Sequence, residues 1–286
     1  MLPRHGEDSG RQVTVPNKGA TGYERVALGV LPAVVLLVIW EIAGQHWRFV
    51  QFFFSTPSQV ATTFLAGLTS GILVLDFLYT LVPTLIGFVL GVGIGTMLGF
   101  LILRLGRLVV AAEWNVLILG SIPIFAIAPM MLVWFGIGLE MKIAMAFLST
   151  VFVALSHAYR GGRSVPRELR LLFEVNRASQ HSVFRKLIFP MSLDWVFASL
   201  RLNANLALLG VFVGEYMASE RGLGHAMLQA GSLYRVANVL AAALAMIILV
   251  VFLDQSVGAI EKRRHRLIQW FAVDYRLSHV HNAQSL

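Results

Sequence analysis

The sequence predicts an all-α, polytopic membrane protein with six transmembrane helices. Of its 286 residues, 57% are hydrophobic and 13% are charged, whereas soluble domains carry about 25% charged residues. Apolar runs long enough to cross a bilayer alternate with shorter basic segments. Because the basic residues cluster between these runs, the net charge of +8 is explained by membrane topology and does not indicate nucleic-acid binding.

The expected helices divide the chain into three parts. Residues 1–25 are polar and are expected to form a cytoplasmic N-terminal tail, residues 26–266 a transmembrane domain, and residues 267–286 a cytoplasmic C-terminal tail. The first span, residues 26–44, is too long for the core of a signal peptide and follows a long charged segment. The aromatic residues after it suit the membrane interface. Pro57 then opens a short amphipathic segment.

A stripe of glycines distinguishes the second span, residues 76–103. Gly87, Gly91, Gly95 and Gly99 recur every four residues, so they share one face of a helix. Such stripes let a second helix approach to backbone contact. We therefore expect this face to pack against another helix and to bind no ligand.

Two prolines interrupt the third span, residues 108–135. Pro123 and Pro129 each remove a backbone hydrogen bond and can kink or break the helix. Broken helices in transporters often line the substrate pathway, so both prolines are candidates for it. The fourth span is expected over residues 141–159.

Two asparagines lie in the fifth span, residues 193–217, where polar side chains must face protein or water. Asn203 and Asn205 have two possible roles. Hydrogen bonding between helices is the favoured one, and contact with substrate in the pathway is the other.

Two charges in the fifth and sixth spans are expected to form a structural pair. Residues 237–260 form the sixth span and contain Asp254. Arg201 and Asp254 each lie about 12 to 13 Å from the cytoplasmic end of their span, at about 1.5 Å per residue. An ion pair between them would neutralise two buried charges.

The distribution of basic residues orients the six spans. With both termini inside, 18 of the 23 lysines and arginines fall on the cytoplasmic side. Four fall on the outer side, and Arg201 lies within a span. The four outer residues are Arg48, Lys142, Arg221 and Arg235. Positive charge collects on the cytoplasmic side of membrane proteins, so both termini are predicted to be cytoplasmic.

The connector between the fourth and fifth spans, residues 160–190, carries seven basic and two acidic side chains. Its apolar residues recur at helical spacing in two short stretches. Pro166 suits the first turn of the leading helix, and Pro190 marks either the end of the trailing one or the entry to the next element. Neither helix can cross a bilayer, so the connector must pack on something at the cytoplasmic surface. A partner protein is the first candidate.

The sequence gives little support to enzyme chemistry. It has no glycine-rich phosphate loop ending in Gly-Lys-Ser or Gly-Lys-Thr, so any ATP must be bound by another chain. It contains no hydrolase or protease motif, no cysteine and no residues spaced as a metal site. The alternative from another class is an ion-coupled secondary transporter, which would call for unpaired ionisable residues at mid-membrane and internal repeats.

Several short motifs carry a resemblance that extends over residues 26–270. In order they are TPSQV (56–60), SIPIFAIAP (121–129), WFGIG (134–138) and GEYMASERGLG (214–224). Taken with the glycine stripe and the connector, the chain resembles permease subunits of bacterial ATP-binding-cassette (ABC) importers. The group in question serves sulfonates, taurine, nitrate, bicarbonate and related small molecules.

The resemblance implies a type I importer permease in the bacterial inner membrane that works by alternating access. Its implied partners are cytoplasmic ATPase subunits, which hold ATP and magnesium, and a periplasmic or lipid-anchored solute-binding protein. It also implies a second permease copy, identical or paralogous, surrounded by membrane lipid. No cofactor is expected in this chain, and the expected substrate is a small, anionic solute.

By the same resemblance, the connector holds two coupling helices that seat in the ATPase. The residues implied in coupling are Glu168, Phe173, Glu174, Val183, Phe184 and Leu187, with Arg177 and Arg185 at the rim. The sequence departs from the family signature, because Arg177 stands where the signature has glycine and Leu171–Phe173 replace Glu-Ala-Ala. If the turn requires a positive φ, Arg177 costs about 1 kcal/mol relative to glycine. Asn176 could take over the turn, and the degenerate signature favours pairing with a different permease.

Glu215 matches an acidic position of the family near the outer end of the fifth span. Its favoured role is structural, as the partner of a helix terminus or an arginine. The alternative is a place in the substrate gate.

Overall fold

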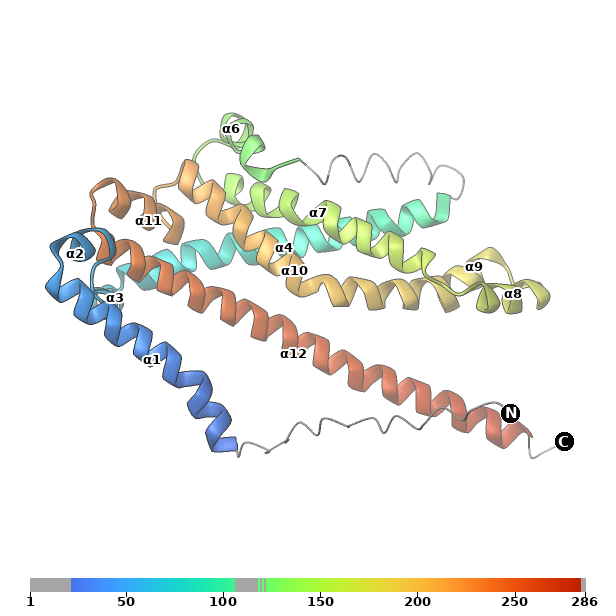
Figure 1. Cartoon of the computed structure of the whole chain (residues 1–286). Helices are drawn as coiled ribbons and strands as arrows, with labels where there is room; N and C mark the ends of the chain where they lie inside the picture. Colours follow the sequence, from blue (N-terminus) through green and yellow to red (C-terminus); the bar gives the residue numbers. More distant parts are fainter. Residues whose placement is uncertain (1–21, 106–117, 119, 121, 284–286) are drawn as a thin grey trace, which may run out of the picture. The chain divides into compact units, whose positions relative to one another are not determined.

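The computed structural model describes residues 22–105, 118, 120 and 122–283, with the backbone alone for residues 22–29, 105 and 263–283. The first half of the predicted third span and most of the predicted N-terminal tail therefore lie outside the described residues. Within the described residues all regular structure is helical (Figure 1). The helices are α1 (Gly22–His46), α2 (Arg48–Phe54), α3 (Pro57–Thr69), α4 (Ile72–Leu105), α6 (Ile124–Phe135), α7 (Leu139–Arg163), α8 (Arg167–Val175), α9 (Gln180–Val183), the π-helix η2 (Phe184–Ile188), α10 (Phe189–Met217), α11 (Leu223–Ser232) and α12 (Val236–Ala283).

Four of these helices, α4, α7, α10 and α12, are long and apolar enough to cross a membrane. A fifth span is present if α1 and the bent segment after it are counted as one. The third predicted span is represented by α6, which has only 12 residues. The described chain thus supports a polytopic helical membrane protein, with four to five of the six predicted spans.

The described residues up to Pro57 form a compact unit of their own. Its described helices are α1 and the short aromatic α2, where the rings of Phe49 and Phe53 lie 4.7 Å apart. Ser55 ends α2 with a φ of 56°. Gly44 of α1 faces Thr56 so closely that a Cβ would lie 2.9 Å from the carbonyl oxygen of Ser55.

In the second unit, which starts at Ser58, α7 packs against the glycine stripe of α4. Gly87, Gly91, Gly95 and Gly99 all face α7, and a Cβ on any of them would overlap an atom of that helix. At Gly99, for example, it would lie 2.7 Å from the Cβ of Ala158. Small residues at this spacing therefore set the distance between the two helices.

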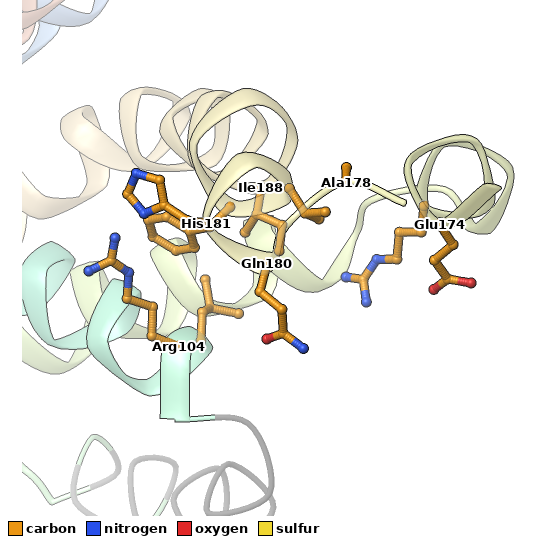
Figure 2. Close-up of a pocket in the computed structure, with 10 residues that line it drawn as sticks. Arg104, Glu174, Ala178, Gln180, His181 and Ile188 are labelled. Atoms are coloured by element: carbon orange, nitrogen blue, oxygen red, sulfur yellow. The ribbon is translucent and has the colours of Figure 1, made fainter. Parts of the chain in front are cut away.

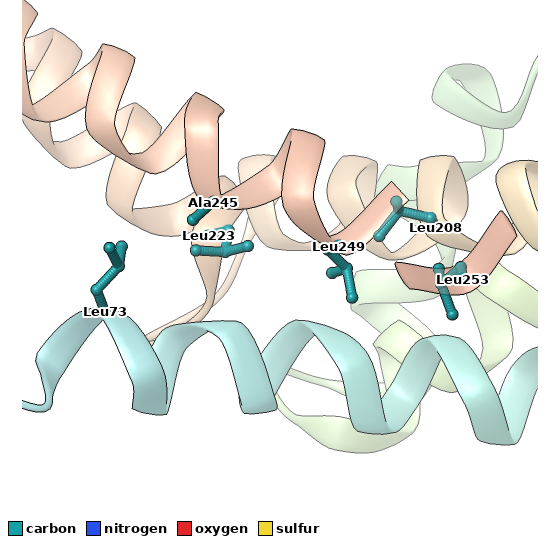
Figure 3. Packing of buried hydrophobic residues seen from close by; sticks show 6 residues of the cluster. All are labelled: Leu73, Leu208, Leu223, Ala245, Leu249 and Leu253. Atoms are coloured by element: carbon teal, nitrogen blue, oxygen red, sulfur yellow. The ribbon is translucent and has the colours of Figure 1, made fainter. Parts of the chain in front are cut away.

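Helix α10 completes the packing of this unit because it contacts α4, α7 and α12. A Cβ on Gly210 would lie 2.6 Å from the carbonyl oxygen of Met145, so α10 and α7 also approach at a glycine. A leucine-rich cluster joins α4, α10, α11 and α12 (Figure 3). Its buried members are Leu73, Leu208, Leu223, Ala245, Leu249 and Leu253.

Helix α12 differs from the predicted sixth span at its end. The prediction ended the span at residue 260, before a run of basic residues, but the helix continues to Ala283. Charged residues can end a membrane crossing without ending a helix, because lysine and arginine are good helix formers.

Candidate functional site

The connector of residues 160–190 folds as a helical hairpin at one end of the second unit (Figure 1). Helix α7 ends at Arg163, and α8 starts at Arg167, directly after Pro166. The Nη2 atom of Arg170 donates a hydrogen bond of 3.0 Å to the carbonyl oxygen of Gly162, which ties α8 back to α7. Helix α9 and η2 then lead into α10.

The turn between α8 and α9 is made by Arg177, whose φ is 50°. The amide of Ala178 donates to the carbonyl of Phe173, and the amide of Arg177 donates to that of Glu174, both at 2.9 Å. These two bonds form a Schellman motif, in which the left-handed position is usually glycine. Asn176, with a φ of −78°, does not take over the turn. The sequence alternative involving Asn176 is therefore wrong, and Arg177 itself bears the conformational cost.

A π-helical turn, residues Phe184–Ile188, separates α9 from α10. The amide of Phe189 donates to the carbonyl of Phe184, five residues earlier. Pro190 follows at once and has no N–H to give to the carbonyl of Lys186, which its ring also crowds. The proline thus explains why the helix widens here. Turns of this kind often lie at functional sites.

The structure divides the eight predicted coupling residues by exposure. Leu187 is only 7% exposed and therefore packs inside the protein. Among the others, Glu168, Glu174, Arg177 and Arg185 are exposed, whereas Phe173, Val183 and Phe184 are half-buried.

The two most exposed apolar residues on α8 were not among the predicted coupling residues. Leu172 is 58% exposed and Val175 is 81% exposed. Their spacing of three residues on a short amphipathic helix is the signal that could have identified them.

Phe184 attaches the hairpin to α4. Its ring centroid lies 6.2 Å from that of Phe100 and 6.4 Å from that of Phe189. The guanidinium of Arg104 lies 4.6 Å above the ring of Phe184. This aromatic cluster joins the hairpin to the end of α4.

The predicted pathway residues do not gather at one surface in the described chain. Pro123 precedes the first residue of α6, and Pro129 lies inside that helix. Asn203 is fully buried, and its Nδ2 atom donates to the carbonyl of Ser199 within the same helix, at 2.9 Å. The described hydrogen bonds of Asn203 therefore stay within α10 and do not show the favoured role in bonding between helices, and its Oδ1 atom is buried without a partner among the described residues. Asn205 is exposed and lines an apolar groove of about 440 Å³ beside α10.

Glu215 is fully buried in a polar network near the C-terminal end of α10, whereas the hairpin precedes the start of that helix. The Nζ atom of Lys142 lies 2.9 Å from its Oε1 atom, and Thr80 Oγ1 lies 2.9 Å from its Oε2 atom. The amide of Gly224 donates to Oε2, also at 2.9 Å. Lys142 donates in addition to the carbonyl of Arg221, at 2.7 Å.

This network caps the N-terminus of α11. Gly222 donates its amide to Asp76 Oδ1, Leu223 to Thr80 Oγ1, and Gly224 to Glu215. Amides at the start of a helix lack partners within it, and here side chains of α4 and α10 supply them. This geometry matches the structural role favoured for Glu215, as the partner of a helix terminus. The charged partner of Glu215 is Lys142, where an arginine was expected. This lysine was not predicted as a partner, although a lysine in an apolar span indicates a buried counter-charge.

Arg201 is shared between two acidic residues of α12. Its Nε atom lies 3.9 Å from Asp254 Oδ1 and 3.3 Å from Glu261 Oε2. Glu261 is thus the nearer partner, and the sequence analysis missed it, although it lies two helical turns after Asp254 on the same face. The expectation that these charges are buried is wrong for this chain alone, because the side chain of Arg201 is 48% exposed.

Comparison with known proteins shows to which family the chain belongs. Residues 87–266 match the family described as "Binding-protein-dependent transport system inner membrane component". A protein of Chloroflexus aurantiacus named riboflavin transport system permease protein RibX is 30% identical over 251 residues, which cover 87% of this chain and 92% of that protein. One of Bacillus subtilis named aliphatic sulfonates transport permease protein SsuC is 27% identical over 245 residues, which cover 85% and 87%.

A solved structure shares the fold. An inward-facing form of the MetNI methionine ABC transporter aligns with a TM-score of 0.59 and 20% identity, covering 68% of this chain and 97% of that one. The family match spans more than half of the sequence and ends within α12, so it includes the glycine stripe, the hairpin and the pair of Lys142 and Glu215. The chain belongs to the inner membrane components of binding-protein-dependent transport systems, the permease subunits of ABC importers.

Proposed function

We propose that this permease forms the translocation pathway of an ATP-driven importer and docks its ATPase through the hairpin of residues 160–190. The observation that carries the proposal is the apolar surface of α8. Leu172 and Val175 are exposed at 58% and 81% on a hairpin rich in basic residues, far too short to cross a bilayer. Exposed apolar residues with a charged rim are typical of a protein interface.

The orientation follows from the same charges. The hairpin and the basic run at Lys262 lie on the cytoplasmic side in this proposal, with both termini also cytoplasmic. The buried network around Glu215 is then at the outer side, where a solute-binding protein delivers the substrate. The domain organisation is a transmembrane domain over residues 26–266 between two cytoplasmic tails, 1–25 and 267–286.

The proposed mechanism is alternating access driven from outside this chain. ATP and magnesium are held by the partner ATPase, and this chain contributes no cofactor. Closure of two ATPase subunits draws two hairpins together, and the cluster of Phe184, Phe100 and Arg104 passes that movement to α4. Asn205, on the exposed side of α10, remains a candidate for the pathway.

A second permease copy is required to enclose the pathway. The Schellman turn at Arg177 forms without the glycine of the family signature, so the departure does not remove the hairpin. Whether the second copy is identical is decided by purifying the complex. Two different permease chains would support the heterodimer favoured by the degenerate signature, and one species with twofold symmetry would exclude it.

The proposed substrate is a small, anionic solute such as a sulfonate, taurine or nitrate. Its support is the similarity to a protein named as an aliphatic sulfonates permease. The similarity to a protein named as a riboflavin permease points to a different solute. A ligand screen on the binding protein that docks to this complex separates these possibilities, since a binding protein that retains only neutral ligands would overturn the anionic assignment.

The test of the whole proposal is reconstitution. The tagged chain should copurify with an ATPase, and uptake into proteoliposomes should need ATP and a binding protein. Uptake should persist when the proton gradient is collapsed. Uptake that stops with the gradient while ATP remains would instead show an ion-coupled transporter.

A further inference from the structure

A cavity of about 620 Å³ lies between the end of α4 and the hairpin (Figure 2). Its polar lining consists of Arg104, Arg170, Glu174, Gln180 and His181. Arg104 comes from α4. Arg170 and Glu174 come from α8, and Gln180 and His181 come from α9. The cavity therefore changes shape whenever the hairpin moves relative to α4.

The charge of this lining favours an anion. The lining holds two arginines, Arg104 and Arg170, and one acid, Glu174, and among the residues that the structure describes neither arginine forms an ion pair with this acid. Within the same part of the chain, the Nε atom of Arg170 is buried without a hydrogen-bond partner. Arg104 has only the ring of Phe184 as a described partner. An anionic ligand would instead pair with the outer nitrogens of both guanidiniums, because among the described residues Arg104 has no hydrogen bond and Arg170 gives one, from Nη2 to the carbonyl of Gly162.

The position of the cavity relative to the membrane limits which kind of anion it can bind. The apolar span of α4 ends at Arg104, which places this residue at the level of the lipid headgroups. Leu103, Val183 and Ile188 provide apolar walls beside the two arginines. A ligand with a charged head and an apolar body, held at the membrane surface, matches both kinds of wall.

We propose that this cavity binds the phosphate-bearing headgroup of an anionic phospholipid. Arg104 and Arg170 hold the phosphate, and the apolar wall covers the glycerol and the first carbons of the acyl chains. The bound headgroup bridges α4 and the hairpin, so it steadies the element that the ATPase moves. The inference rests on the cytoplasmic placement of the hairpin in the proposed function, but binding can be measured without transport.

The experiment is native mass spectrometry of the complex purified with the full-length chain. Three probes distinguish the source of the phosphate: phosphatidylglycerol, zwitterionic phosphatidylcholine and free glycerol 1-phosphate. Phosphatidylglycerol should bind in preference to the other two. Arg104→Gln and Arg170→Gln should each weaken its binding by about tenfold, the loss expected for one charge-assisted hydrogen bond. Arg235→Gln, which alters an arginine at the outer end of the bundle, is the matched control and should bind normally.

Glu174→Gln tests the same site without removing a cation. It deletes the acid of the cavity, so phosphatidylglycerol should bind more tightly. Equal binding by wild type and all the cavity variants would overturn the proposal. Binding of glycerol 1-phosphate as tight as that of the lipid would also overturn it, because the ligand would then be a free phosphate ester. Equal retention of phosphatidylcholine would show that the cavity does not select an anion. None of these results depends on the substrate or on ATP-driven uptake.

Discussion

The Nζ atom of Lys142 lies 2.9 Å from Oε1 of Glu215, and both side chains are almost completely shielded from solvent. The carboxylate also accepts hydrogen bonds from Thr80 and from the amide of Gly224. The pair thus joins α7, α10 and the start of α11 into one rigid corner. Nothing in this arrangement leaves Glu215 free to meet a substrate without breaking the corner.

We expect Glu215→Met to destabilise the protein by about 3 to 5 kcal/mol, because it leaves Lys142 buried without its counter-charge. Lys142→Met should be similarly harmful. The double variant Lys142→Met with Glu215→Met should recover much of the loss, since it leaves no buried charge. The measurement is thermal unfolding in detergent. Losses that simply add in the double variant would show that the two residues are not coupled.

The glycine stripe gives a second prediction with a built-in control. A Cβ on Gly91 would overlap Thr150 of α7, whereas Gly93 has no atom within 4 Å of the Cβ position. Gly91→Ala should therefore push α4 and α7 apart and cost about 1 to 3 kcal/mol. Gly93→Ala should be neutral or slightly stabilising, because alanine has the better helix propensity. Unfolding temperatures of the two variants decide the matter, and equal temperatures would contradict the assigned contact.

The turn at Arg177 predicts a gain in stability. Because its φ of 50° suits glycine, Arg177→Gly should stabilise the hairpin by about 1 kcal/mol. Asn176→Gly is the control and should destabilise the hairpin, since the φ of −78° is open to any residue. Glycine there adds freedom to the unfolded chain and removes the hydrogen bond from Asn176 Nδ2 to the carbonyl of Leu172. Hydrogen exchange of the amides of residues 177 and 178 reports on the turn directly. Faster exchange in Arg177→Gly would contradict the prediction.

The sequence was sufficient for features that depend on local patterns. The four-residue spacing of Gly87 to Gly99 predicted a packing face, and the structure shows α7 against it. The signature position of Arg177 predicted that this residue would replace glycine in a turn, and its φ is positive. The first feature follows from helical periodicity within a short segment. The second follows from the resemblance to the family signature, which marked the position, together with the stereochemistry of a left-handed turn.

Features that depend on long-range packing were missed or placed incorrectly. Lys142 and Thr80 are far from Glu215 in sequence, so nothing local indicated that they meet it. Leu187 was assigned to the ATPase interface, yet it is buried, because periodicity identifies an apolar face without saying what covers it. The same limit explains why the exposed Leu172 and Val175 were not selected.

Two substitutions in the hairpin should separate docking from coupling. Val175→Asp places a charge on the most exposed apolar position of α8, so it should weaken ATPase binding by about 2 kcal/mol, as expected for a central interface residue. Phe184→Asp instead disrupts the contact with Phe100 and Arg104 behind the hairpin. It should leave membrane insertion and ATPase binding intact while hydrolysis no longer drives uptake.

The two variants are compared by copurification of the ATPase, ATP hydrolysis and uptake in the same proteoliposomes. Loss of the ATPase from Val175→Asp with retention in Phe184→Asp is the expected result, because only Val175 faces outward. Arg185→Gln, an exposed change at the rim, should reduce binding less than Val175→Asp, since exposed charges contribute little. If Phe184→Asp transports at the wild-type rate, movement of the hairpin does not reach α4 through this aromatic cluster, and another contact must carry it.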